Sequence, residues 1–128
     1  MPTFPVVTGD VLTSTIFNGL PAFAVQTAKT ADYTAASGDE YQQLIPMNKA
    51  TAIAFKIPTD ATYAFPVGTV ITVLNIGAGL LTISAVTPGT TTVLSAGATA
   101  ASPTLAQYKS AACIKTAANA WYVIGAIA

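Results

Sequence analysis

The sequence predicts an all-β fold, an antiparallel β-sandwich or roll of short strands with one short helix and an extended N-terminal arm. Three observations lead to this expectation. Apolar and polar residues alternate with a period of two in several short stretches, as strands with one buried face do. Six or so such stretches are separated by turn residues. The length of 128 residues suits one domain of moderate core size.

The chain divides into two parts that differ in composition and in the alternation of apolar and polar residues, an N-terminal arm (residues 1–32) and a β-domain (residues 33–128). The arm holds three of the five phenylalanines, several prolines and little alternation. Residues 13–20 have the pattern of one short helical turn, too short to persist without packing on something else. Burying each large apolar side chain is worth about 1.5–3 kcal/mol, so we expect the arm to dock on a surface outside the β-domain. The interface residues predicted in the arm are Phe4, Ile16, Phe17, Leu20 and Phe23.

The β-domain begins with a predicted short helix followed by strands. Residues 37–40 read Ser-Gly-Asp-Glu, the spacing of a capping box, which predicts a helix over Asp39–Gln43 that Pro46 ends. In the strand Thr51–Ile57, every second residue is large and apolar. Pro58 to Pro66 is a predicted loop.

A hairpin is expected next, from Thr69–Ile76 and Leu80–Val86 joined by Gly-Ala-Gly, because glycine permits the positive φ angles of a tight loop. Both faces of the first strand are mostly apolar. One face would fill the core, and the other, carrying Ile71 and Val73, would be covered by a neighbouring subunit. A closed homo-oligomer is therefore expected.

The C-terminal third continues the β pattern. Residues 87–90 read Thr-Pro-Gly-Thr, which fits a type II turn. A weaker strand is expected at Thr91–Ser95, followed by coil over Ala96–Pro103. The last hairpin pairs Tyr108–Thr116 with Ala120–Ile127 around Ala-Ala-Asn.

Composition excludes several classes of protein. Apolar residues make up 52%, charged residues only 8%, and the mean hydropathy is +0.59. The most apolar stretch, Val67–Val86, is interrupted by Thr, Asn and Gly, so no membrane span is expected. Five scattered lysines and no arginine provide no basic face, which argues against nucleic-acid binding. The start of the chain lacks a basic region before an apolar run, so we expect synthesis and retention in the cytoplasm.

Catalytic chemistry has few candidate residues. There is no histidine, and the lone Cys113 lies in an apolar stretch where a buried thiol is expected. Asp39 and Glu40 are interpreted as helix-start acids. We therefore expect no enzyme activity, no cofactor and no metal site. Trp121 and Tyr122 could form a sugar-binding platform, but alternation places at least one of the two rings in the core.

An ordered series of short motifs runs through the β-domain. It comprises Met47-Asn48, Ile57-Pro58, Phe65-Pro66-Val67-Gly68-Thr69, Gly77-Ala78-Gly79, Thr82-Ile83, Ser95-Ala96-Gly97, Gln107-Tyr108, Ile114-Lys115 and Trp121. The series resembles a small β-module of tailed-bacteriophage structural proteins, over roughly residues 33–125. Gly9-Asp10-Val11-Leu12-Thr13 with Phe17-Asn18 is similar to a leader often seen at the start of such proteins.

The resemblance implies a virion structural protein that is made in the host cytoplasm and binds the major capsid protein or other virion proteins. It also implies that the chain forms a homo-oligomer, a trimer. A small chain with an apolar arm best suits a capsid decoration (cement) protein on the outside of the phage head. The alternative is a tail-fibre or tail-tip subunit that contacts the host surface. A carbohydrate-binding module is the third candidate.

Overall fold

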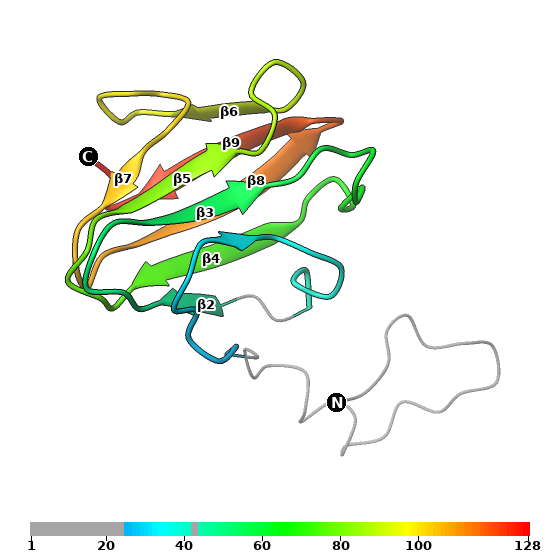
Figure 1. The fold of residues 1–128 in the computed structure, drawn as a ribbon. Helices are drawn as coiled ribbons and strands as arrows, with labels where there is room; N and C mark the ends of the chain where they lie inside the picture. The colour runs from blue at the N-terminus through cyan, green and yellow to red at the C-terminus, as the bar shows by residue number, and fades with distance from the viewer. Residues whose placement is uncertain (1–24, 42–43) are drawn as a thin grey trace, which may run out of the picture.

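The computed structural model describes residues 25–41 and 44–128, and within them it is all-β. The described residues form nine strands in two mixed sheets, one of four strands and one of five (Figure 1). The four-stranded sheet has the order β1-β3-β5-β7, with β1 at Tyr33–Thr34, β3 at Ile53–Ile57, β5 at Leu81–Ala85 and β7 at Thr104–Leu105. The five-stranded sheet has the order β2-β4-β8-β9-β6, with β2 at Leu44–Met47, β4 at Val70–Asn75, β8 at Ser110–Ala117, β9 at Ala120–Gly125 and β6 at Thr92–Ser95.

The expectation of an antiparallel arrangement is wrong for more than half of the strand pairs. Four pairs are parallel, β1 with β3, β3 with β5, β2 with β4 and β6 with β9. Three are antiparallel, β4 with β8, β5 with β7 and β8 with β9. From β1 to β8, consecutive strands alternate between the two sheets. Every second strand therefore returns to the same sheet, and this is how parallel neighbours arise without long connections.

The expected hairpin around Gly77 and Gly79 is a crossover between the two sheets, because β4 and β5 belong to different sheets and do not pair. Glycine is needed at both positions because another segment of backbone lies against each of them, and not because the position requires a positive φ. A Cβ atom on Gly77 would lie 2.3 Å from the Lys49 backbone nitrogen, and one on Gly79 would lie 1.8 Å from the Thr51 carbonyl oxygen. The β4–β5 connection thus lies directly against the β2–β3 connection.

Asn75 organises this crossover from the end of β4. Its side chain is fully buried, and its amide donates to the carbonyl oxygens of Gly79 and Leu105, each at 2.8 Å. Its side-chain oxygen accepts from the Gly77 backbone N–H at 3.1 Å. A buried amide side chain must find such partners, and here they fix three segments of chain to one another.

The predicted helix at Asp39–Gln43 is wrong for the described residues 39–41, which form turns; residues 42 and 43 lie outside the described chain. The physical reason is the direction of the Asp39 carboxylate. It is 5% exposed and accepts hydrogen bonds from the Gln26 side chain at 2.6 Å and the Tyr33 hydroxyl at 2.8 Å. It also accepts from the Ala36 N–H at 2.8 Å. The carboxylate therefore fastens a loop and caps no helix.

Two of the predicted turns are present. The Thr90 N–H donates to the Thr87 carbonyl at 3.0 Å, but Gly89 does not adopt a positive φ, so the turn is not of type II. The C-terminal hairpin is confirmed, with β8 and β9 antiparallel and a register shift between Lys115 and Ala117. Asn119 provides the positive φ of 51° in its turn.

The β-domain begins before Tyr33, where the arm was expected to end. Val25 bridges Leu44 and Lys29 bridges Met47, both in parallel, so residues 25–29 flank the free edge of β2. The Gln26 N–H donates to the Leu44 carbonyl at 3.0 Å. Among the arm residues, only positions 25–32 are described. We call residues 1–24 the leading segment.

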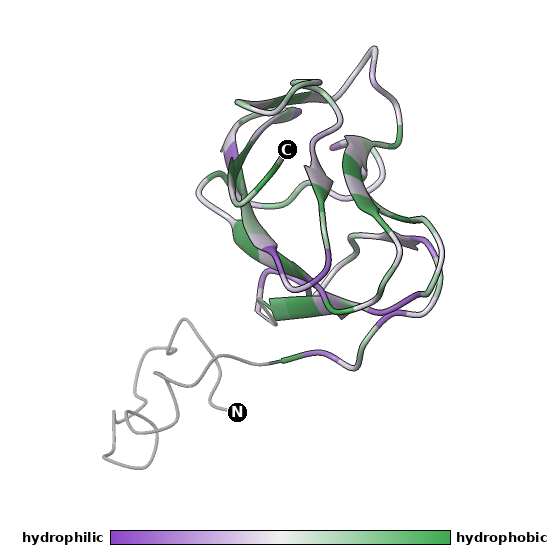
Figure 2. Ribbon diagram, turned by 90° about the vertical axis from the view of Figure 1, so that its left-hand side faces the viewer, coloured by the Kyte–Doolittle hydropathy of each residue, from purple (hydrophilic) through white to green (hydrophobic). Residues whose placement is uncertain are grey.

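A single hydrophobic cluster takes side chains from both sheets, and the ribbon in Figure 2 alternates accordingly between apolar and polar residues. The predicted inward face of β3, with Ile53, Phe55 and Ile57, is confirmed. Trp121 is 1% exposed and its ring lies edge-on to Phe65, with centroids 5.6 Å apart.

Ile71 and Val73 belong to this cluster, at 1% and 0% exposure. The prediction that they meet a neighbouring subunit is therefore wrong, because the same chain encloses them. The two faces of β4 are exchanged relative to the expectation. Val70 faces outward, and the inward positions are Ile71, Val73 and Asn75.

Candidate functional site: the outer face of the five-stranded sheet

The outward side of the five-stranded sheet carries a continuous row of apolar side chains across four strands. Val70 of β4 is opposite Ile114 of β8, and Ile114 is opposite Tyr122 of β9. Tyr122 is in turn opposite Leu94 of β6. Side chains directly opposite on one face lie close enough to contact. We call Val70, Ile114, Tyr122 and Leu94 the apolar row.

The next row on the same face is also uncharged. It consists of Thr72, Ala112 and Ile124, again aligned by register. Exposure is substantial for an apolar surface: 41% for Leu94, 46% for Tyr122 and 56% for Ile124. We call the apolar row, with Thr72, Ala112 and Ile124, the outer face.

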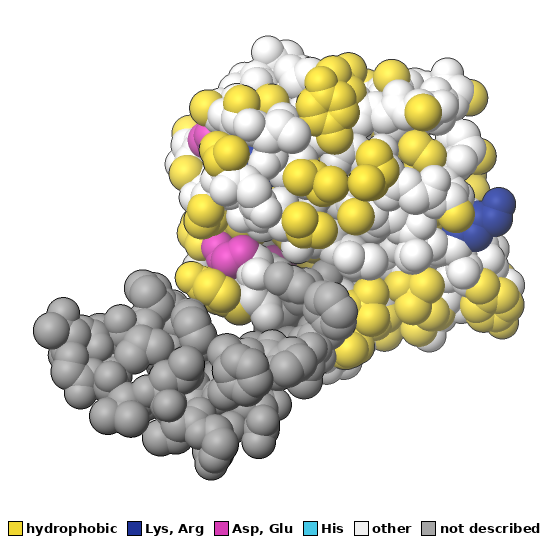
Figure 3. Space-filling model, turned by 180° about the vertical axis from the view of Figure 1, so that it is seen from behind, with side chains coloured by type: hydrophobic (Ala, Val, Ile, Leu, Met, Phe, Trp, Pro, Cys, Tyr) yellow, Lys and Arg dark blue, Asp and Glu magenta, His cyan; other side chains and the backbone are white. Residues whose placement is uncertain are grey.

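Charge is absent from this face. The five strands of the sheet contain one charged residue, Lys115, and its side chain points inward at 2% exposure. Figure 3 views the molecule from this side, with hydrophobic side chains across the middle and charged ones at the margins. Contiguous exposed apolar patches of this kind mark interaction sites on proteins.

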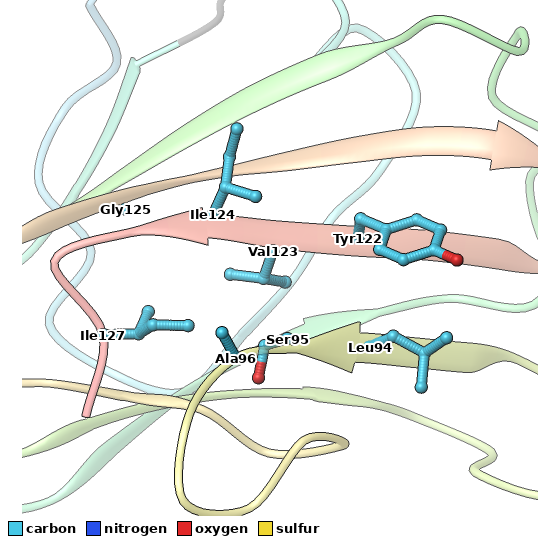
Figure 4. A pocket seen from close by; sticks show the side chains of 8 residues that line it. All are labelled: Leu94, Ser95, Ala96, Tyr122, Val123, Ile124, Gly125 and Ile127. Atoms are coloured by element: carbon cyan, nitrogen blue, oxygen red, sulfur yellow. The ribbon is translucent and has the colours of Figure 1, made fainter.

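A groove of about 400 Å³ lies at the β6–β9 end of the outer face. Figure 4 shows Tyr122 and Ile124 of β9 on one side of it, Leu94 of β6 on the other, and Ile127 at its end. Its remaining lining comes from Ser95, Ala96, Val123 and Gly125. Its shape and lining suit an apolar side chain and offer no charged group to a polar ligand.

The most buried lysine of the described residues, Lys115, belongs to a separate cluster on the inner side of β8. The Lys115 ammonium donates to Asp60 Oδ1 at 2.8 Å and to the Phe65 carbonyl at 2.6 Å. Asp60 Oδ2 accepts from the Asn119 N–H at 3.1 Å, and the Asp60 N–H donates to the Asn119 side-chain oxygen at 2.8 Å. These bonds tie the loop Pro58–Pro66 to the β8–β9 turn, and each charged atom has a structural partner.

This cluster was not predicted from the sequence. Asp60 has the look of an ordinary turn residue, and Lys115 follows an apolar run. The available signal was the alternation of β8, which places Lys115 on the same side as Cys113 and Ala111. A lysine at an inward position requires a buried acceptor.

Two tyrosines hold the acidic pair Asp39 and Glu40. Tyr33 donates to Asp39, and its own ring lies under the Lys29 ammonium at 4.3 Å. Burial, with the Asp39 hydrogen bond and negative charge, raises the pKa of Tyr33 to about 12. Tyr63 donates a hydrogen bond to Glu40, and this bond is the main reason that the pKa of Tyr63 is raised. Both acids thus have structural partners.

The remaining candidate residues lie as follows. Cys113 is in the core as predicted, and burial raises the pKa of its thiol to about 12. Trp121 is enclosed, while Tyr122 is exposed on the outer face. The predicted interface residues of the arm, Phe4, Ile16, Phe17, Leu20 and Phe23, lie outside the described residues.

Within residues 25–41 and 44–128, no three His, Cys, Asp or Glu side chains gather as metal ligands would. The same residues contain no helix long and apolar enough to cross a membrane. Comparison with known proteins finds no matching family model, no matching curated protein and no matching solved structure. The resemblance to bacteriophage modules therefore stays a prediction.

Proposed function

We propose that this chain is a non-enzymatic virion structural protein, specifically a capsid decoration protein that binds the outside of a phage head. The two sheets would form a small sandwich-like module. The observation that carries the proposal is the outer face, which is apolar, uncharged and continuous over four strands. Such a face can be buried against protein without desolvating an ion, whose removal from water costs several kcal/mol.

On the particle, we place the leading segment against the capsid shell and the outer face against neighbouring copies or the major capsid protein. The homo-oligomer expected from the sequence then forms on the particle, with a trimer as the state that the resemblance implies. The two surfaces have matching chemistry. The leading segment has one charged side chain, Asp10, and the outer face has none.

The alternative remains a tail-fibre or tail-tip subunit, which would use the same uncharged face within a tail. The carbohydrate-binding module receives less support. Trp121 is enclosed in the core, so of the two aromatic residues predicted to form the platform only Tyr122 is exposed.

Adding labelled protein to particles that lack it tests the proposal directly. We expect electron microscopy to show many copies spread over the head. Label confined to the tail would favour the alternative, and no binding to particles would refute the virion role.

Matched variants separate the outer face from general surface effects. Leu94→Ser and Leu80→Ser make the same change at similarly exposed positions, 41% and 49%, but only Leu94 is in the apolar row. We expect Leu94→Ser to reduce the number of bound copies and Leu80→Ser to leave it unchanged. Deleting residues 1–24 should remove attachment, since those residues carry the proposed anchors.

A further inference from the structure

We propose that in the free protein the leading segment of each chain covers the outer face of its own five-stranded sheet. Its apolar residues would lie along the apolar row, and Phe17 would reach the groove between β6 and β9. This inference concerns the protein in solution and does not depend on the virion role.

The place where the described chain begins supports this inference. Val25 bridges Leu44, and Leu44 is opposite Thr72 of β4, so Val25 lies level with Thr72. The apolar row begins at Val70, two residues before Thr72. Phe23 precedes Val25 by the same two residues, so a chain that continued in register would bring Phe23 level with the start of the row.

The length of the leading segment is sufficient to cross the sheet. Neighbouring strands are about 4.8 Å apart, so the distance from residues 25–29 across β2, β4 and β8 to β9 is about 19 Å, and to β6 about 24 Å. With Phe23 level with the start of the apolar row, Phe17 is six residues further along, which span about 20 Å when extended. The backbone of Phe17 can therefore reach β9, and its side chain the groove between Tyr122 and Leu94.

Chemistry and connectivity favour this occupant over others. The leading segment has one charged residue in 24, and the outer face has none, so burial desolvates no ion pair. A segment joined directly to the sheet edge competes at a high effective concentration, which a second copy at micromolar concentration does not match. The apolar area that it covers offsets the entropy lost when the segment is ordered.

Paramagnetic relaxation by a spin label on the leading segment tests the proposal. The label is attached to Ser14→Cys, which leaves the phenylalanines intact. Cys113 does not compete for the label, because its thiol is fully buried. We expect the amide signals of Tyr122, Ile124 and Leu94 to broaden strongly, and those of Lys56 and Thr82 on the four-stranded sheet to broaden much less. Equal broadening of both sheets would overturn the proposal.

A mixed sample distinguishes the chain's own segment from that of a neighbour. Isotope-labelled protein without the spin label is mixed with spin-labelled protein without the isotope. We expect no broadening of Tyr122 and Leu94 in the mixture. Broadening as strong as in the single-chain sample would show that a second copy covers the face, and would refute the proposal.

Dye binding gives an independent measurement on the truncated chain. The described β-domain includes residues 25–32, so the deletion ends at residue 24. We expect removal of residues 1–24 to raise the fluorescence of an apolar-surface dye several-fold. Leu94→Ser in the truncated chain should lower that fluorescence, and Leu80→Ser should not. If the intact and truncated chains bind the dye equally, the leading segment does not cover the outer face.

Discussion

The buried ion pair between Lys115 and Asp60 gives the sharpest test of how this fold is held together. Lys115 is 2% exposed, and its two acceptors are Asp60 Oδ1 and the Phe65 carbonyl. Asp60→Ala leaves the ammonium enclosed with one neutral acceptor. Breaking a buried pair by removing one partner costs about 3–5 kcal/mol, and we expect a loss in that range from the free energy of unfolding.

Lys115→Met should cost less, about 1–3 kcal/mol, because it removes the buried charge. Of the two acceptors that lose their donor, the Phe65 carbonyl is buried, whereas the Asp60 carboxylate is 22% exposed and can be hydrated. The unbranched methionine side chain keeps most of the packing. In the double variant Asp60→Ala/Lys115→Met, no buried charge is left unpaired, so the loss should be close to that of Lys115→Met alone. The expected coupling energy then equals the cost of Asp60→Ala, about 3–5 kcal/mol.

Urea unfolding followed by fluorescence measures these differences, because the chain has one tryptophan and Trp121 is 1% exposed. The coupling should persist in 1 M salt, which screens exposed pairs but hardly affects buried ones. Lys56→Met, at a more exposed lysine, is the control and should change stability by less than about 0.5 kcal/mol. A coupling energy below about 0.5 kcal/mol would be typical of a surface pair, and would refute the reasoning.

Other contacts of the described residues give tests of single side chains. Gly79→Ala should destabilise the protein severely in urea unfolding, because the new methyl group would overlap the Thr51 backbone. A methyl group on Gly89 would meet nothing within 4 Å, so Gly89→Ala is the control and should be neutral. Equal effects of the two substitutions would contradict the close approach of the β4–β5 and β2–β3 connections. Asp39→Ala should lower the free energy of unfolding by about 2–4 kcal/mol, since three donors lose their acceptor. The double variant Asp39→Ala/Glu40→Ala should lose no enzymatic activity. A hydrolytic activity of the native chain that disappeared in the folded double variant would show that the pair is catalytic. The raised pKa of Tyr33, about 12 against 10 in the unfolded chain, favours the protonated hydroxyl in the fold, so its contribution is complete below pH 10 and is lost as pH rises toward 12. The stability difference between the native chain and Tyr33→Phe should decline over that interval, and a difference independent of pH would contradict the hydrogen bond to Asp39.

Local alternation predicted the strands well because it depends only on which face of a strand is buried. The inward set of β3, the C-terminal hairpin and the burial of Cys113 all follow from side-chain period and short turns. The pairing of strands did not follow, because a Gly-Ala-Gly link looks the same in a hairpin and in a crossover. What distinguishes them here is the backbone of Lys49 and Thr51, each of which is 28 residues away in the chain from the glycine that it contacts.

The exchange of the two faces of β4 has a related cause. Val70, Leu74 and Ile76 are as apolar as Ile71 and Val73, so hydrophobicity alone does not say which set is enclosed. The deciding residue is Asn75, which shares the inward face with Ile71 and Val73 and is fully buried. Asparagine is usually exposed, so the sequence favours an outward direction for the face of β4 that carries Asn75. Its burial depends on the carbonyls of Gly79 and Leu105, which only the folded chain supplies.

The outer face was not predicted, for the same reason, although each of its residues lies in a strand that the sequence predicted. Its apolar row consists of single residues from four strands, Val70, Ile114, Tyr122 and Leu94, separated in sequence by turns and by other strands. Each alone is an ordinary exposed apolar residue, which needs no explanation. Only the register aligns them, and only the inward direction of Lys115 removes charge from the surface between them. The buried ion pair therefore has two consequences. It fastens the loop Pro58–Pro66 beneath β8, and it leaves the outer face free of charge and suited to an equally uncharged partner.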